Sequence, residues 1–364
     1  MTEAKSQSAP SAPRRVLLLK GHSAGIGDLL RSSAAWRALR QAWPQAELHL
    51  WFLSQAPGSA AEALIARHPL LASFTASDKR PQGRRGWQAL FRDARDIGER
   101  VRPDWVIDCE PNGLRTSLLT WYLRRRTGAF TVGIAQVPVR RWFYQKTAPS
   151  TQTFAQQRGL PFPLEYTERD FTVLTALGIE RRGNTIELQE TAEGGTFRAR
   201  LLEELGAASQ RPILGLNIGC GTSDAVPKRP SLDLLVALVG ELQRRHGCAL
   251  LLTGAPYEQA VNREFLQHLP AAGPVLDLAG RTTLLELTGA IAACRLFISS
   301  DSGPYHMAVA LRVPTLALFK TPNPQHYHRN VWTDCLVTPD ARSLPDALAA
   351  AERLWLVTPP PMPT

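Results

Sequence analysis

The stretch RLFISSDSGPYHMAVALRVPTLALF, residues 295–319, joins two short apolar runs through a small polar link and a proline. Residues 296–300 predict a buried strand, residues 304–312 a helix, and residues 315–319 a second strand. A strand, a crossover helix and another strand in this order are typical of a parallel sheet. The chain is therefore expected to contain an α/β domain here.

The same alternation of strand and helix continues on the N-terminal side of this stretch. Strands are expected at 14–20, 47–53, 104–110, 129–134, 213–219 and 248–254, and helices at 28–43, 231–247 and 282–295. Two such series predict two doubly wound α/β domains facing across a cleft. We expect a disordered tail over 1–13, an N-terminal domain over 14–190, a linker between about 185 and 205, a C-terminal domain over 205–345, and a helix with a loose tail over 346–364.

Composition narrows the class of protein. The chain has 364 residues, of which 44% are hydrophobic and 20% charged, and no apolar run reaches the roughly 20 residues that span a bilayer. The first thirteen residues lack an apolar signal core, so we expect a cytoplasmic protein. The five cysteines form no C-x-x-C pair, which argues against a disulfide framework or a zinc site.

Positive charge is concentrated in the N-terminal part. Residues 1–150 carry 23 Lys and Arg against 11 Asp and Glu, whereas residues 151–364 carry 19 against 21. This asymmetry indicates an anionic partner, which can be nucleic acid, a membrane surface or an acidic substrate. The alternative is a set of solvated arginines on helix faces.

Polar loops follow three of the predicted strands, where ligands bind in this class of fold. The loop GHSAGIGD, residues 21–28, matches neither the dinucleotide nor the P-loop pattern, and Asp28 is either functional or a helix cap. The loop at 220–230 offers hydroxyls such as Thr222 and the cations Lys228 and Arg229, which suit a diphosphate. Glu258 is placed to accept bonds from a ribose or to favour a helix N-terminus.

The link at 301–306 combines the features of an anion site. Asp301 or Ser302 can cap the following helix, Gly303 permits close approach, and Pro304 suits the first helical position. Amides of the first turn then favour a bound anion, and His306 can add a donor. The alternative for His306 alone is a structural role.

Residues 276–319 resemble the donor-binding block of glycosyltransferase family nine, the ADP-heptose:lipopolysaccharide heptosyltransferases. Similar elements are GIGDLLRSSAAWRALRQAWPQAEL, WVIDCEPNGLRTSLLT and LLTGAPYE. Three departures from the family pattern are a longer loop between Lys20 and Asp28, Lys228-Arg229-Pro230 without an aromatic, and Lys320 in place of a glycine. The sugar, the nucleotide base and the choice of Lys228 or Arg229 as the diphosphate ligand stay open.

The resemblance implies a GT-B fold and an inverting transfer with no metal or other cofactor. It implies that Asp28 is the general base that takes the proton from the acceptor. By the same resemblance, the residues expected to bind the nucleotide-sugar donor are Lys228, Thr222, Glu258, Asp301, Ser302, Gly303 and His306.

In this family the N-terminal domain binds a lipid-linked acidic saccharide, which suits basic clusters at 79–87, 124–126 and 140–146. Acceptor or loop candidates are Gly27, Arg140, Arg141 and Lys320. We expect a protein peripheral at the inner face of the inner membrane and no nucleic-acid partner, since no RNA-binding motif accompanies the clusters. Alternatives are a relative with another donor or acceptor and a non-catalytic nucleotide-sugar-binding protein. A dinucleotide oxidoreductase is disfavoured because its glycine pattern is absent.

Overall fold

The structure is a computed structural model that describes residues 12–21, 25–219, 227–271 and 273–362. The chain divides into two compact units. The N-terminal unit comprises residues 1–23, 34–58 and 69–184, and the C-terminal unit comprises residues 24–33, 59–68 and 185–364. Two short segments of the N-terminal half therefore belong to the C-terminal unit.

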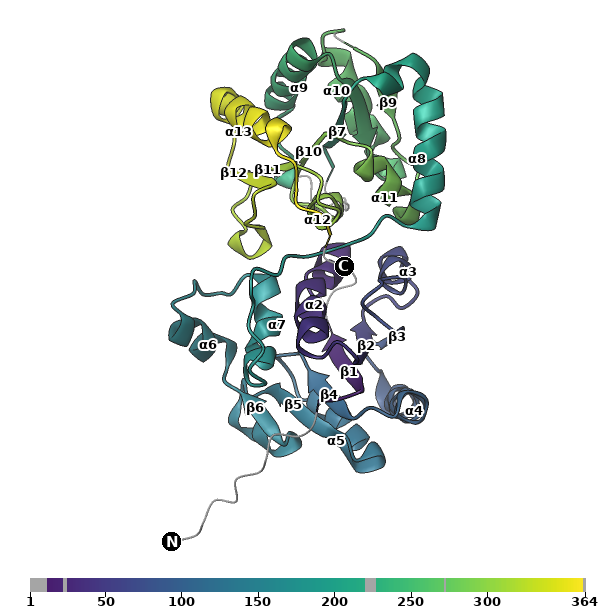
Figure 1. The fold of residues 1–364 in the computed structure, drawn as a ribbon, viewed down its shortest axis with the longest axis vertical. Coiled ribbons are helices and arrows are strands. Elements are labelled where there is room, and N and C mark those ends of the chain that lie inside the picture. Colours follow the sequence, from purple (N-terminus) through teal and green to yellow (C-terminus); the bar gives the residue numbers. More distant parts are fainter. Residues whose placement is uncertain (1–11, 22–24, 220–226, 272, 363–364) are drawn as a thin grey trace. The chain divides into compact units, whose positions relative to one another are not determined.

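The N-terminal unit contains a six-stranded parallel sheet with strand order β3-β2-β1-β4-β5-β6. Its strands are β1 (Arg15–Gly21), β2 (Glu47–Ser54), β3 (Ser73–Asp78), β4 (Trp105–Asp108), β5 (Phe130–Ile134) and β6 (Lys146–Ala148). Its helices are α2 (Ser33–Ala42), α4 (Gly83–Val101), α5 (Arg115–Thr127), the 3₁₀ helix η1 (Pro138–Phe143), α6 (Thr151–Arg158) and α7 (Tyr166–Thr175). Leucines of α4 and α5 pack on the apolar side chains of β1, β2 and β4, which buries one face of the sheet. Figure 1 shows the strands and helices of this unit as ribbons.

The C-terminal unit repeats this architecture with strand order β12-β11-β10-β7-β8-β9, again all parallel. Its strands are β7 (Ile213–Asn217), β8 (Ala249–Thr253), β9 (Val275–Asp277), β10 (Leu296–Ser299), β11 (Thr315–Phe319) and β12 (Thr333–Val337). Its helices are α1 (Ile26–Leu30), α3 (Ala60–Ile65), α8 (Ala192–Leu205), α9 (Leu232–His246), α10 (Gln259–His268), α11 (Leu284–Ala292), α12 (Gly303–Ala310) and α13 (Leu344–Leu356). The short 3₁₀ helices η2 (Gly206–Gln210), η4 (Pro256–Glu258), η5 (Pro324–His326) and η6 (Ala341–Ser343) complete it.

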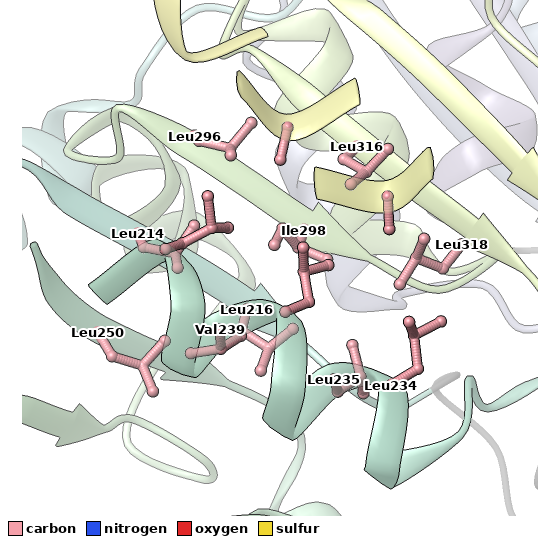
Figure 2. Close-up of a cluster of buried hydrophobic side chains, with 14 of the residues drawn as sticks. Leu214, Leu216, Leu234, Leu235, Val239, Leu250, Leu296, Ile298, Leu316 and Leu318 are labelled. Carbon is pink, nitrogen blue, oxygen red and sulfur yellow. The ribbon is translucent and has the colours of Figure 1, made fainter. Parts of the chain in front are cut away.

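The core of the C-terminal unit lies between its sheet and the helices α9, α10 and α13. Figure 2 shows leucines of β7, β8, β10 and β11 pointing toward Leu234, Leu235 and Val239 of α9. Because alternate residues of a strand face opposite sides, Leu214 and Leu216 both reach this layer. The apolar runs of the sequence therefore become the central strands, as predicted.

The structure differs from, or adds to, the sequence-based expectations at three points. The single helix predicted over 28–43 is two helices, α1 and α2, separated at Arg31 and Ser32. The expected linker at 185–205 contains helix α8, whose N-cap Thr191 accepts the amide of Gly194, and the units divide between Asn184 and Thr185. The region around 79–87, read only as a basic cluster, includes the start of the long helix α4.

Candidate functional site

A cavity of about 530 Å³ lies within the C-terminal unit, where β7, β8 and β10 end. Helix α1 forms part of its wall, and Tyr257, Leu284 and Leu287 give it an apolar side. The cavity brings together these residues named from the sequence: Gly27, Asp28, Lys228, Glu258, Asp301, Ser302, Gly303 and His306. Ligands bind at this end of the strands in doubly wound sheets.

Asp28 is the third residue of α1, and Gly25 is the N-cap of that helix. The helix-cap alternative for Asp28 is therefore wrong. Its carboxylate lines the cavity, and Oδ1 accepts a hydrogen bond from Nη1 of Arg31 at 3.2 Å. A carboxylate in this position can accept a proton from a ligand hydroxyl.

Arg31 connects Asp28 to His306. Its side chain is only 2% exposed, and Nη2 lies 2.8 Å from Nε2 of His306. Because a guanidinium can only donate, Nε2 of His306 accepts this bond, and Nδ1 carries the proton toward Nε2 of His328 at 2.8 Å. Burial, together with the charge of Arg31, lowers the pKa of His306 well below its usual value, so the ring is neutral.

This contact revises the expected role of His306. Both ring nitrogens are engaged within the protein, so the imidazole orients Arg31 and does not add a free donor to a ligand. Sequence reasoning did not identify Arg31 or His328. The only signal for Arg31 was its position three residues after Asp28, one turn along a helix.

Two glycines allow α1 to approach α12 closely. A Cβ atom at Gly27 would overlap the ring of His306, and one at Gly303 would lie 2.5 Å from Cγ2 of Ile26. Any larger side chain at either position would push the helices apart. Gly27, expected as a loop or acceptor residue, thus sets the distance between Asp28 and α12.

The N-terminus of α12 is available to an anion. Ser302 occupies the N-cap position in extended conformation. Its hydroxyl donates to Oδ1 of Asn217 at 3.0 Å and accepts no hydrogen bond from an amide of the helix. Gly303 takes the first helical position, so Pro304 is second and not first as predicted. The Ser302 side chain leaves the first-turn amides uncapped, and these amides and the helix dipole favour a negatively charged ligand.

Asp301 lies in a cluster of donors beside this terminus. Nδ1 of His326 is 2.7 Å from Oδ1 of Asp301, and Lys228 and Asn323 each donate to Oδ2 at 3.3 Å. Burial raises the pKa of Asp301, but the hydrogen bond and charge of His326, together with Lys228, outweigh it and leave the pKa below its usual value. Lys228 keeps its ammonium at the cavity, whereas Arg229 is not among the residues that line it.

Glu258 is buried at the start of α10, and its Oε2 accepts the amide of Ala255 at 2.8 Å. This bond fits the helix-terminus alternative of the sequence analysis. The carboxylate also lines the cavity, as the ribose alternative requires.

Asp301, His306 and His326 form a group whose ligand atoms lie within 4.8 Å of one another, close enough to share a metal ion. The donor set fits poorly, because His306 is engaged by Arg31 and His328, and Asp301 by Lys228 and His326. The positive charges of Arg31 and Lys228 beside this group also oppose the binding of a divalent ion. The arrangement is that of a hydrogen-bonded cluster.

Other residues named from the sequence lie elsewhere. Thr222 lies outside the described residues. Lys320 is exposed and is not among the residues lining the cavity. Arg140 is not part of an exposed basic surface, because its side chain is completely buried and paired with Asp108 in the N-terminal unit. Arg141 is exposed.

Comparisons with known proteins extend these observations. Residues 185–337 match the family described as glycosyltransferase family 9 (heptosyltransferase). Lipooligosaccharide heptosyltransferase 2 of Haemophilus influenzae is 28% identical over 139 residues, so the match spans 38% of this chain and 39% of that protein. Lipopolysaccharide heptosyltransferase 2 of Salmonella typhimurium is 23% identical over 323 residues, 82% of this chain and 81% of that protein.

Solved structures agree in fold. A family 9 glycosyltransferase from Veillonella parvula has a TM-score of 0.70 at 21% identity and covers 92% of this chain and 89% of its own. The Escherichia coli ADP-heptose lps heptosyltransferase II has a TM-score of 0.63 at 20% identity, with 93% and 98% covered. Together with the two parallel sheets, this likeness confirms the predicted GT-B fold class.

Proposed function

We propose that this chain is a glycosyltransferase of family nine that transfers a heptose from ADP-heptose to a lipopolysaccharide core acceptor. The family match over residues 185–337 and the heptosyltransferase relatives support this proposal. One observation carries the proposal. Asp28 lines the same cavity as Lys228 and the uncapped N-terminus of α12, so a proton acceptor and an anion site share one space. A transfer from a nucleotide sugar needs both.

The proposed step is a single inverting displacement. The acceptor hydroxyl oxygen forms a bond to the anomeric carbon, the bond from that carbon to the diphosphate oxygen breaks, and the electron pair leaves with ADP. Asp28 takes the hydroxyl proton, on the face opposite the leaving group. Lys228 and the first-turn amides of α12 stabilise the negative charge that develops on the diphosphate.

Metal independence is part of the proposal. Lys228 and the helix dipole supply the positive charge that a divalent ion would otherwise supply to the leaving group. We expect full activity in excess chelator, whereas a strict requirement for magnesium would contradict this part of the mechanism.

The proposed acceptor is an acidic saccharide on a lipid, at the inner face of the inner membrane. The excess of Lys and Arg in residues 1–150 supports an anionic acceptor and an anionic surface. Among the described residues, none of the helices combines the length and apolar character needed to cross a bilayer.

The decisive experiment replaces Asp28 by Asn. We expect turnover to fall by about 10³-fold or more, because general base catalysis contributes up to roughly 10⁴-fold, while calorimetry gives an unchanged dissociation constant for ADP-heptose. A matched screen of ADP, UDP, GDP and their sugars tests the donor. Unchanged turnover in Asp28→Asn with intact donor binding would disprove the base.

Two alternatives make different predictions in the same experiments. A relative with another donor or acceptor would bind a different nucleotide sugar more tightly and still depend on Asp28. A non-catalytic nucleotide-sugar-binding protein would bind the donor through Lys228 and the 301–306 loop but show no turnover that depends on Asp28.

A further inference from the structure

The 3₁₀ helix η1 in the N-terminal unit presents apolar side chains to solvent. It follows β5 in the chain and begins beyond the C-terminal end of that strand. Val137 is 45% exposed, Val139 37% and Trp142 80%. We refer to these three side chains as the apolar wedge. Exposed apolar side chains so close together are typical of a surface that meets a partner.

A buried polar cluster holds the base of η1 in place. Nη2 of Arg140 lies 2.9 Å from Oδ2 of Asp108 and 2.7 Å from the hydroxyl of Tyr144, and Nη1 donates to the carbonyl of Pro111. Tyr144 also donates to Asp108 at 2.5 Å and lies 2.8 Å from the hydroxyl of Ser117. A buried ion pair adds little net stability but fixes a geometry. The wedge is therefore held rigidly outward.

Positive charge flanks the wedge. Arg141 and Lys146 are both exposed, and no Asp or Glu occurs between residues 135 and 148. An aromatic ring beside cations is the pattern that enters the head-group region of a bilayer, with the cations at lipid phosphates. A rigid wedge also loses little conformational entropy on contact.

We propose that the apolar wedge and its two flanking cations dock this protein on the surface of an anionic lipid bilayer. Trp142, Val137 and Val139 enter the interfacial region, and Arg141 and Lys146 contact phosphate groups. The inference rests on the proposed function, which requires a lipid-linked acceptor, and it names the residues that reach the membrane.

The test measures binding of the full-length chain to vesicles containing about 30% phosphatidylglycerol, by co-sedimentation at low salt. Trp142→Ala should weaken binding by roughly tenfold, as expected for withdrawing most of a large apolar side chain from an apolar phase, and Arg141→Gln by a few-fold. Added salt should reduce the contribution of Arg141 to vesicle binding and leave the contribution of Trp142 unchanged. Trp121→Ala, which removes an exposed ring from α5, and Arg182→Gln, at an exposed arginine outside the basic clusters, are the matched controls and should bind within about twofold of the unchanged protein.

Several outcomes would overturn the proposal. Equal losses for Trp142→Ala and Trp121→Ala, or no loss for either, would remove the wedge from the membrane contact. Concentration-dependent association in lipid-free solution that Trp142→Ala abolishes would assign the wedge to a second copy of the chain. Calorimetry of ADP-heptose on the same variants keeps the two proposals apart, because donor binding tests the cavity alone and vesicle binding tests the wedge alone.

Discussion

Arg31 and Arg140 are both buried arginines paired with an aspartate, yet their surroundings differ. Arg140 lies in the N-terminal unit between Asp108, Tyr144 and the carbonyl of Pro111, where Asp108 is itself completely buried. Arg31 lies in the C-terminal unit between a neutral His306 and Asp28, whose carboxylate faces the cavity. A buried arginine thus indicates a functional site when one of its partners remains accessible to a ligand. It indicates a structural role when none of its partners is accessible.

The largest effect on stability is expected at Arg140. Arg140→Met leaves the carboxylate of Asp108 buried without its counter-charge, which should lower the free energy of unfolding by about 3–5 kcal/mol. Urea unfolding measures this loss, and Arg141→Met, at the exposed neighbour, should stay within about 0.5 kcal/mol of the unchanged protein. A loss below 1 kcal/mol for Arg140→Met would mean that Arg140 does not anchor η1.

Arg31 should affect turnover more than stability. Arg31→Gln removes a charge-assisted hydrogen bond to Asp28, worth about 1.5–3 kcal/mol in general, so we expect kcat to fall roughly tenfold to hundredfold with little change in donor KM. The loss of unfolding free energy should be smaller than for Arg140→Met, because Asp28 can be hydrated from the cavity. An unchanged kcat with a large loss of stability would place Arg31 in the same class as Arg140.

Gly27 tests whether the distance between α1 and α12 matters to Arg31. Gly27→Ala introduces a methyl group that overlaps the His306 ring, which should cost about 1–3 kcal/mol of stability and lower kcat as Asp28 moves. Gly195→Ala in α8 is the control, since a methyl group there meets no neighbour within 4 Å and should be neutral or slightly stabilising. Equal behaviour of the two variants would contradict the close contact.

The smallest effect concerns pH. His306 faces Arg31, His326, His328 and Lys228, and its pKa is lowered well below the usual value of about 6.5, chiefly by burial. Between that lowered pKa and about 6.5 only the unfolded state binds the proton, so the free energy of unfolding should decrease as the pH falls below about 6.5, by up to about 1.4 kcal/mol per pH unit.

Urea unfolding of His306→Gln between pH 5 and 7 measures the contribution of His306 to the pH dependence of the free energy of unfolding. The variant should show a shallower pH dependence that retains the part due to His49, whose pKa is also lowered, mainly by burial. Asp301 does not interfere, because its lowered pKa acts only below about pH 4. An unchanged slope would mean that His306 is not held neutral by its neighbours.

The central strands could be predicted from the sequence, while several peripheral elements could not. β1, β7 and β10 are short apolar runs because both faces of a central parallel strand are covered. The edge strands β3 and β12 carry mostly half-buried residues and lack such a run, so nothing local distinguishes them from loops. Helix α4 is not predicted, although its buried residues follow helical spacing, because the arginines at its start are typical of a basic surface cluster.

The candidate site was predicted where it depends on short motifs and missed where it depends on packing. Residues 301–303 connect the end of one strand to the first residue of one helix, so local rules locate them. The contact between Arg31 and His306 joins positions 275 residues apart in the chain, and no local pattern reports it. The same limit applies to Arg140, whose charge suggested a surface and whose pairing with Asp108 places it in the interior.

The contact between Gly27 and His306 has an evolutionary consequence. The ring of His306 occupies the space that a side chain at position 27 would need, so neither position can change freely while the other is kept. Among related sequences, we expect glycine at the position of Gly27 wherever histidine stands at the position of His306, and a larger residue there only where that histidine has been replaced by a smaller side chain. The two positions would then change together during evolution, even though they lie far apart in the chain.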